Sequence, residues 1–289
     1  MVIVGDSILG LLNKKPQGFL IPMLVDHTID LPACESEYEA MLNKTSRHDY
    51  RKSLRNYKFV ISTDIGDVDS FLNDFHRNTM KAAYPDEAII ISRRDLLAEI
   101  SRGAFFCKIY DLSELCVAVA LMSTSDDFVR IHRLGILNGD YSKLKNLCFT
   151  AIYSSAVRYA IKMGKNKVIL GASSSIIESG LFKFKAKWQS VSSQPLIYNV
   201  NARMLINAEH YSVVNFFENN TQIIFDEGEY SLLGSAKSSA AAIKALKSNA
   251  PGWSFKHYYS IASEAKSSRV RSLPKWFPAQ ARNNFTCIL

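Results

Sequence analysis

The chain has 289 residues, of which 47% are hydrophobic and 21% are charged, and its formal net charge is +8. These fractions are those of an ordinary globular protein with one large domain or two small ones, so the core needs no disulfide or metal to support it. A basic surface favours polyanionic partners, which include nucleic acid, phosphate-bearing cosubstrates and anionic membrane faces.

The five cysteines are scattered and form no Cys-x-x-Cys pair, which argues against a zinc site or thioredoxin-like chemistry. Free thiols of this kind indicate a reducing compartment, so we expect a cytoplasmic protein and no bound metal. The start of the chain lacks the basic and apolar regions of a signal peptide. The longest apolar run, residues 19–25, contains Pro22 and is too short to span a bilayer.

The first half of the chain predicts a strand over residues 18–25, with Pro22 at a sheet edge or bulge. A helix over 36–56 follows and begins with a capping box formed by Ser36 and Glu39. We then expect a strand at 58–63, a helix over 64–82, a short strand-like run after residue 89 and a helix at 94–100. Three consecutive strands, 104–110, 115–123 and 128–137, predict an antiparallel meander.

The second half predicts a long helix over 143–163 that ends at Gly164, a buried strand at 167–170 and a short helix rich in lysine and aromatic residues. Weaker patterns follow: a strand at 195–200, a helix at 203–219, a hairpin over 221–233 and a helix at 238–247. From residue 263 the chain is polar and basic, and we expect a docked or partly disordered arm there.

A basic stripe lies on the first long helix. Arg47, Arg51 and Arg55 recur every four residues, with Lys52 beside them, so their side chains share one face. This pattern has two interpretations, a solvated helix face or a ridge that binds nucleic acid.

A second basic cluster lies between residues 141 and 187, which hold nine Lys or Arg residues and one acid, Glu178. Lys143 and Lys145 begin a predicted helix, where the helix dipole disfavours cations unless an anion is bound. The alternative is that these lysines only keep the surface soluble.

Four stretches in order resemble the GNAT acyltransferase superfamily in its FemX-like branch. They are the meander and three short patterns: Tyr38-x-x-Met41-Leu42-x-Lys44-x-x-Arg47-x-x-x-Arg51-Lys52, Tyr159-Ala160-x-x-x-Gly164, and Leu170-Gly171 followed by Phe184-Lys185-x-x-Trp188. The resemblance implies an α/β fold of the α+β type, with a mixed, mainly antiparallel central sheet, a splayed strand pair and flanking helices. We expect an N-terminal strand segment at 1–32, the acyltransferase core at 33–235 and a C-terminal helix with a basic tail at 236–289.

The resemblance also implies the chemistry. The acyl carbonyl of the donor enters the split between the third meander strand and strand 167–170, and an amine attacks it directly. Lys185 aligns with the lysine that contacts the donor phosphate or the developing oxyanion, although Trp188-Gln189 stands where the family pattern has Phe-Gly. A structural reading of Lys185 is that its stem packs on Phe182 or Trp188. The donor-binding candidates are Lys143, Lys145, Arg133, Lys183, Trp188, Gly171 and Ser173.

The transfer needs a proton acceptor. Asp140 and Tyr141 follow the third meander strand at the expected mouth of the split, and His132 lies on that strand. A histidine on a strand is also commonly a core residue, and His48 with Asp49 on the basic helix is a second possible pair.

The donor itself is left open between two classes. Gly135 and Gly139 are too far apart for the tight glycine loop that holds the pyrophosphate in acetyl-CoA enzymes, so aminoacyl-tRNA is preferred over acyl-CoA. The sequence therefore predicts an N-acyltransferase with no tightly bound cofactor and with an amine-bearing small molecule or peptide as acceptor. The alternative is a catalytically inactive module of the same fold that binds RNA or another polyanion.

Overall fold

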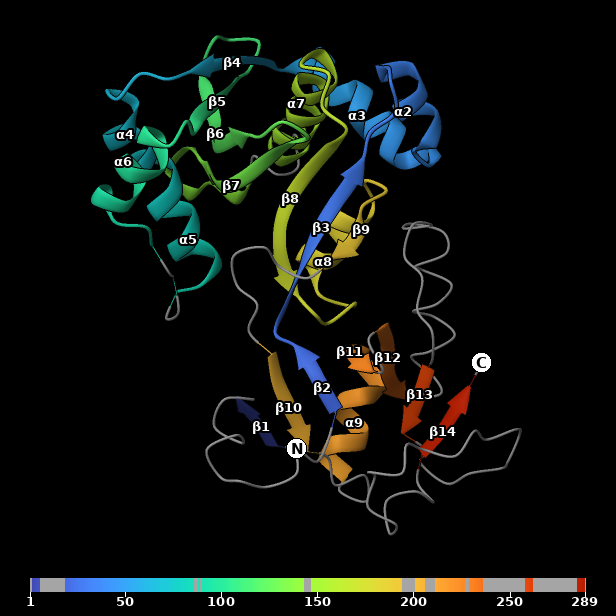
Figure 1. The fold of residues 1–289 in the computed structure, drawn as a ribbon. Coiled ribbons are helices and arrows are strands. Elements are labelled where there is room, and N and C mark those ends of the chain that lie inside the picture. Colours follow the sequence, from blue (N-terminus) through green and yellow to red (C-terminus); the bar gives the residue numbers. More distant parts are fainter. Residues whose placement is uncertain are drawn as a thin grey trace. The chain divides into compact units, whose positions relative to one another are not determined.

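A computed structural model describes residues 2–5, 19–85, 88, 90–142, 147–193, 201–205, 211–226, 229–235, 258–261 and 285–288. The chain forms two compact units (Figure 1). The central unit is Thr28–Gly171, and the terminal unit joins Met1–His27 to Ala172–Leu289. The division crosses strands β3 (Leu24–Asp30) and β8 (Lys167–Ser174). The three-part division expected from the sequence stays a prediction beside this one.

The predicted meander forms the middle of the central unit. Strands β4 (Lys58–Ser62), β5 (Phe105–Tyr110), β6 (Cys116–Thr124) and β7 (Phe128–Ile136) pair antiparallel in sequence order. β8 pairs parallel with β7, and the sheet order is β4-β5-β6-β7-β8-β3-β9, with β9 at Val191–Ser193. The predicted fold, a mixed and mainly antiparallel sheet flanked by helices, is confirmed.

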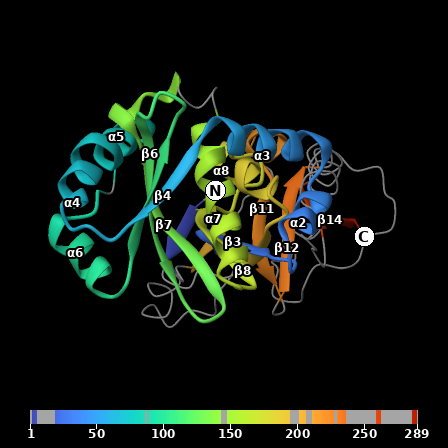
Figure 2. The same ribbon diagram turned by 90° about the horizontal axis from the view of Figure 1, so that it is seen from above.

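Helices cover both faces of this meander (Figure 2). On one face lie α4 (Asp67–Ser70), η1 (Phe71–His76), α5 (Arg77–Ala83) and α6 (Arg93–Ser101). Their apolar side chains pack on alternate residues of the strands, among them Phe106, Val119 and Leu121. Helix α7 (Cys148–Lys162) contacts the opposite face, where the alternation of a strand places Ala118 and Ala120.

The segment α4–η1–α5 is the single helix predicted over 64–82, but its middle turn, η1, is a π-helix. The segment packs closely on β7 and on the turn after it. A Cβ atom on Gly135 would lie 2.5 Å from the Phe75 carbonyl carbon, and one on Gly139 would lie 2.6 Å from the Asn78 carbonyl oxygen. Gly135 therefore allows the helical segment to touch the backbone of β7, and Gly139 allows it to touch the turn after β7.

Two helices stand where the sequence predicts one over 36–56. α2 (Glu35–Met41) and α3 (Lys44–Asn56) are separated by an extended turn, and the Asn43 side chain caps α3 by accepting from the Ser46 N–H. The predicted capping box is wrong, because α2 begins after Cys34 without a side-chain cap. α3 buries Ser46, Tyr50 and Ser53, and the Ser53 hydroxyl lies 2.8 Å from that of Ser154 on α7.

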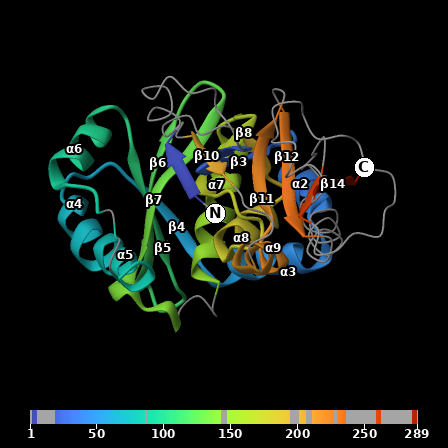
Figure 3. The same cartoon turned by 90° about the horizontal axis from the view of Figure 1, so that it is seen from below.

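The terminal unit holds a second sheet with the order β1-β10-β2-β11-β12-β13-β14. Its strands are β1 (Val2–Gly5), β10 (Asn201–Leu205), β2 (Phe19–Pro22), β11 (Gln222–Asp226), β12 (Glu229–Ser235), β13 (Tyr258–Ile261) and β14 (Phe285–Ile288). Helices α8 (Gly180–Ala186) and α9 (Tyr211–Asn219) lie beside β11 and β12 (Figure 3).

Several predictions for the second half need correction. Residues 201–205 form a strand rather than the start of the predicted helix over 203–219, because they pair with both β1 and β2. Residues 285–288 form a strand within the segment expected to be an arm. The predicted hairpin over 221–233 is confirmed. The strand expected at 195–200, the helix at 238–247 and Lys143 with Lys145 lie outside the described residues.

Candidate functional site

The predicted split lies between β7 and β8. The two strands pair only from Phe128 to Arg130 on β7 and from Lys167 to Ile169 on β8, although both strands continue. On the other side of β7, the register with β6 shifts so that Leu121 opposes Arg133 and Met122 opposes Ile131. His132 is therefore a bulge residue, and the bulge bends β7 at the point where β8 stops pairing with it.

The far end of β7 is held by the helical segment instead. His76 Nδ1 lies 3.1 Å from the Leu134 carbonyl oxygen, and the Thr79 hydroxyl lies 2.7 Å from the Ile136 nitrogen and 3.3 Å from its oxygen. Between these contacts and the pairing with β8 lies a window of three residues, Ile131–Arg133. Within the described residues, the β8-facing edge of this window lies between the two sets of contacts and is the part of the split that we consider for a ligand.

His76 was not found by sequence analysis. A carbonyl oxygen only accepts, so Nδ1 of His76 carries the proton and Nε2 keeps its lone pair. The residue is 2% exposed, and Nε2 is buried without a partner among the described residues. Burial lowers the pKa of His76, the bond to Leu134 raises it and the charge of Arg133 lowers it, with a net decrease. The imidazole is therefore a neutral acceptor at pH 7.

His132 is half-buried on the bulge, and its Nε2 lies 2.7 Å from the Ser123 hydroxyl. Burial, together with the charges of Arg130 and Arg133, lowers the pKa of His132 to about 4. An imidazole with this pKa is a weak base at neutral pH, so the structure gives less support to His132 as proton acceptor than the sequence did.

Three other predicted residues of the central unit have structural partners. Arg133 lies 3.9 Å from the Glu99 carboxylate, and its Nε is buried without a partner among the described residues. Asp140 is exposed and accepts hydrogen bonds from the backbone and hydroxyl of Ser142. The Tyr141 hydroxyl donates to the Thr79 carbonyl at 3.4 Å, and burial raises the pKa of that hydroxyl.

Lys185 lies in the terminal unit and is 4% exposed. Its ammonium donates to the Ala172 carbonyl at 2.8 Å, which links α8 to the end of β8. His27 is fully buried nearby, with its ring nitrogens 2.8 Å from the Ser173 hydroxyl and 3.0 Å from the Ser190 hydroxyl. Burial, and then the charge of Lys185, hold the pKa of His27 well below its ordinary value.

The remaining donor-binding candidates differ in accessibility. Lys183 is exposed, Trp188 is 1% exposed and Ser173 is 1% exposed. Gly171 has a φ of +77°, a conformation that favours glycine. A buried indole and a buried hydroxyl contribute to packing in this structure, and the donor-binding role of these four residues stays a prediction.

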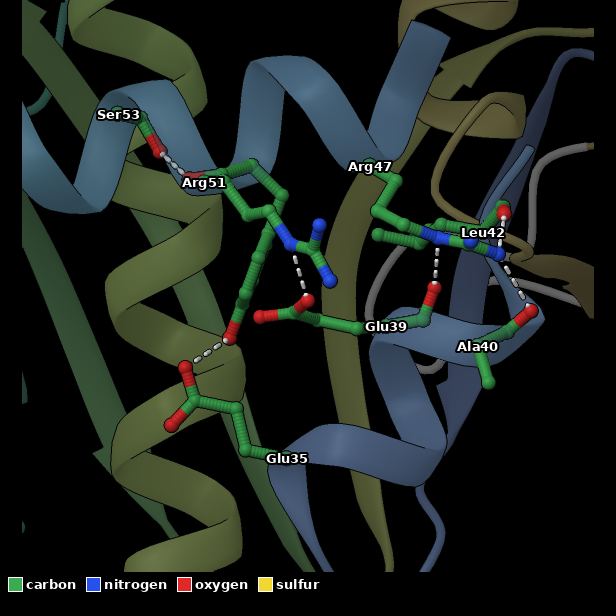
Figure 4. A network of polar contacts seen from close by, with 8 residues as sticks. Glu35, Glu39, Ala40, Leu42, Arg47, Arg51 and Ser53 are labelled. Carbon is green, nitrogen blue, oxygen red and sulfur yellow. Dashed lines mark hydrogen bonds and ion pairs between the residues drawn. The ribbon is translucent and has the colours of Figure 1, made fainter. Parts of the chain in front are cut away.

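The basic stripe of α3 is partly used by the fold (Figure 4). Arg47 donates to the carbonyls of Glu39, Ala40 and Leu42, at 2.7, 2.9 and 2.9 Å, and so caps the C-terminus of α2. Arg51 Nε lies 2.6 Å from the Glu39 carboxylate. Lys52 and Arg55 are exposed and make no hydrogen bond or ion pair within the described residues.

A hollow of about 740 Å³ lies over this stripe. One cation comes from a different helix, because Arg158 of α7 lines it together with the residues of α3. Arg158 Nε lies 3.1 Å from the Glu35 carboxylate. The lining is Glu39, Lys44, Arg47, His48, Arg51, Leu54, Arg55 and Arg158.

Models of known protein families and curated proteins give no match to the chain. Among solved structures, FemX superposes with a TM-score of 0.47 and 11% identity over 69% of this chain and 68% of FemX. The chain resembles FemX. L-PGS from Bacillus licheniformis superposes with a TM-score of 0.43 and 11% identity over 70% of this chain and 66% of L-PGS. A GCN5-related N-acetyltransferase from Sphaerobacter thermophilus superposes with a TM-score of 0.33 and 13% identity over 71% of this chain and 60% of the acetyltransferase.

The predicted resemblance to FemX and GNAT proteins is thus confirmed as a resemblance, and a likeness of this degree assigns no activity. The residues predicted from it fall into two groups. His132, Arg133, Asp140 and Tyr141 lie along β7 and the turn after it, whereas Ser173, Lys183, Lys185 and Trp188 belong to the terminal unit. His76 and Thr79 were missed, and Arg158 was not connected with the stripe of α3, because only contacts between distant segments reveal these roles.

No helix in the described ranges is both long and apolar enough to cross a bilayer. Within the same ranges, no three His, Cys, Asp or Glu side chains converge as metal ligands would.

Proposed function

We propose that the chain is an N-acyltransferase that moves an acyl or aminoacyl group from an activated donor onto an amine. The observation that carries this proposal is the end of β7–β8 pairing beside the bulge at His132. Backbone groups at a strand edge that its neighbour has left are ready hydrogen-bond partners, and a carbonyl oxygen can accept from a backbone N–H of the window Ile131–Arg133.

The reaction is direct attack. The amine nitrogen forms a bond to the donor carbonyl carbon, the bond from that carbon to the donor oxygen or sulfur breaks, and one proton leaves the amine. We assign this proton to Nε2 of His76, because its tautomer is fixed by Leu134 and its lone pair has no partner among the described residues. Since Nε2 is buried, we propose that a water between the amine and the imidazole relays the proton.

Aminoacyl-tRNA is the preferred donor and acyl-CoA is the next. Gly135 and Gly139, the glycines nearest to the place of a CoA-binding loop, are engaged in the close contact with the helical segment. An exposed basic face on α3 favours a nucleic acid as the carrier of the acyl group. The acceptor is an amine-bearing small molecule or peptide, and the protein is expected to act in the cytoplasm.

A catalytically inactive module that binds RNA is the second candidate. The observation in its favour is the weak basicity of the histidines beside the window, because burial lowers the pKa of both His76 and His132.

The test is intact-mass detection of acylated amines, with a panel of aminoacyl-tRNAs and acyl-CoAs as donors. His76→Asn is the informative variant, since the Asn amide keeps the donor to Leu134 and removes Nε2. We expect turnover to fall by roughly 10²- to 10⁴-fold. His132→Gln is the matched control and is expected to change turnover by less than about threefold. No product from any donor supports the inactive module, and an equal loss in both variants contradicts the role of His76.

A further inference from the structure

The basic hollow of the central unit carries an inference of its own. We propose that it binds the phosphate backbone of an RNA double helix. Five cations and one carboxylate line its 740 Å³, and the cations come from two helices that are distant in the sequence, α3 and α7. The proposal deepens the proposed function, on which it rests for the choice of RNA.

Three of the cations are held in place by the fold. Glu39 accepts from Arg51 Nε, and Glu35 accepts from Arg158 Nε, so in each pair the carboxylate binds the inner nitrogen of the guanidinium (Figure 4 shows the first). The terminal Nη atoms lie farther out along each side chain and match the two-point geometry that phosphate oxygens accept. Arg47 is fixed by the carbonyls at the end of α2. Glu39 and Glu35 thus orient Arg51 and Arg158 as well as partly neutralising them.

The other two cations are not engaged by the fold. Lys44 and Arg55 lie at opposite ends of α3, are exposed and make no hydrogen bond or ion pair within the described residues. Arg47, Arg51 and Arg55 are four residues apart, which places successive side chains about 5–6 Å from one another along one face. A row of cations at regular spacing suits a ligand with regularly spaced negative charges better than one isolated anion.

The chemistry of the lining decides between ligands. Among the described residues that line it, Leu54 is the single aliphatic one, whereas a membrane-bound helix presents a broad apolar face. The same described lining contains no Phe, Tyr or Trp, so it offers no platform for stacking unpaired bases. A duplex offers its phosphates without requiring stacking, and proteins recognise duplex RNA mainly through phosphates and 2′-hydroxyls.

The test measures binding of a fluorescently labelled 16-base-pair RNA duplex, which carries no aminoacyl group, to the full chain. Binding is followed by fluorescence anisotropy at several salt concentrations. The hollow variant is Lys44→Gln with Arg55→Gln, which removes two cations without leaving an acid unpaired. The control is Arg94→Gln with Arg102→Gln, two exposed cations on and after α6 that also make no ion pair within the described residues. Both double variants have the same net charge.

We expect the hollow variant to bind about 10- to 100-fold more weakly at 0.1 M salt, with a slope of log K against log salt that is smaller by about 2. The control should bind within about threefold of the unsubstituted chain. Equal losses in the two double variants would overturn the inference, and so would salt-dependent binding to anionic phosphatidylglycerol vesicles with none to RNA. A DNA duplex that binds equally well assigns the site to duplex phosphates in general and contradicts the choice of RNA.

The outcomes separate this inference from the proposed function, because binding of a duplex without an aminoacyl group requires no acyl transfer. RNA binding through the hollow without any acylated product refutes the proposed acyltransferase activity alone. Acyl transfer from acyl-CoA by a chain with no affinity for RNA refutes the proposed RNA binding by the hollow alone.

Discussion

Helices α3 and α8 carry cations at similar density, and the fold uses them differently. On α3 most of the cations remain at the surface, around the hollow, and Arg47 is the one whose guanidinium donates to three carbonyls at the end of α2. On α8, Lys183 is exposed whereas Lys185 is buried and bound to the Ala172 carbonyl. In both helices the structural cation is the one that reaches a backbone carbonyl where a neighbouring helix or strand ends. The acceptor, rather than the density of charge, therefore decides which cation belongs to the fold.

Replacing Lys185 should have the largest effect. Lys185→Ala removes a buried stem and the donor to the Ala172 carbonyl, so we expect the free energy of unfolding to fall by about 3 kcal/mol. Lys183→Ala, on the same helix, should change it by less than about 0.5 kcal/mol. Urea unfolding monitored by Trp fluorescence measures both. Equal losses of unfolding free energy in the two variants would contradict the different roles of Lys185 and Lys183 in α8. The turnover per folded molecule of Lys185→Ala separately tests the predicted contact of Lys185 with the donor.

The next largest change in the free energy of unfolding is expected when the pH is lowered, because of His27. The pKa of His27 is well below its ordinary value of 6.5 in the folded chain, so below pH 6.5 the unfolded chain binds a proton that the folded chain does not. Stability from this residue is present above pH 6.5 and decreases as the pH falls toward the folded pKa. The loss grows by at most about 1.4 kcal/mol per pH unit until the pH reaches the folded pKa.

Urea unfolding at pH 7 and pH 5 measures this loss. His27→Asn should flatten the profile, and His48→Asn, at an exposed position, should leave it unchanged. Lys185→Met should bring the pKa of His27 closer to 6.5, because it removes the nearby charge. A Lys185→Met profile identical to that of the unsubstituted chain would mean that His27 and Lys185 do not interact, and an unchanged profile in His27→Asn would mean that His27 does not cause the pH dependence.

The smallest effect is expected on α3. Arg47→Gln loses the hydrogen bonds to three carbonyls at the end of α2, so the free energy of unfolding should fall by about 1–2 kcal/mol. Arg55→Gln, two helical turns later, should change it by less than about 0.5 kcal/mol. Thermal unfolding of the two variants provides the comparison. A larger loss for Arg55→Gln would show that the exposed end of the stripe also supports the fold.

Local patterns predicted most of the elements around the site. The meander, the helix at 64–82 and the α8 helix are confirmed, because apolar spacing and turn residues act within a few positions. The break between α2 and α3 was missed, since Arg47 stabilises it through carbonyls five to eight residues earlier. The strand at 201–205 was missed because its partners, β1 and β2, are about 200 and about 180 residues away.

The candidate site was less predictable than the fold. The split between β7 and β8 followed from the resemblance, and the pairing confirms it. The protonation of His76 and His132 depends on burial and on Leu134, Arg130 and Arg133, none of which a local pattern weighs. Gly135 and Gly139 could be excluded as a phosphate loop from their spacing alone, but their contact with the helical segment required the tertiary structure.

The π-helical turn η1 makes the hold on β7 dependent on one residue. An α-helix turns by about 100° per residue, and the wider turn absorbs an additional residue before α5 begins. Deleting one position from Phe71–His76 would let the turn relax to ordinary helix with α5 still in phase, whereas inserting a further residue would rotate α5 by about 100° and swing Thr79 away from Ile136. After such an insertion the free edge of β7 would lengthen without any change in β7 itself, so single-residue insertions in η1 offer a route by which this architecture can widen its opening.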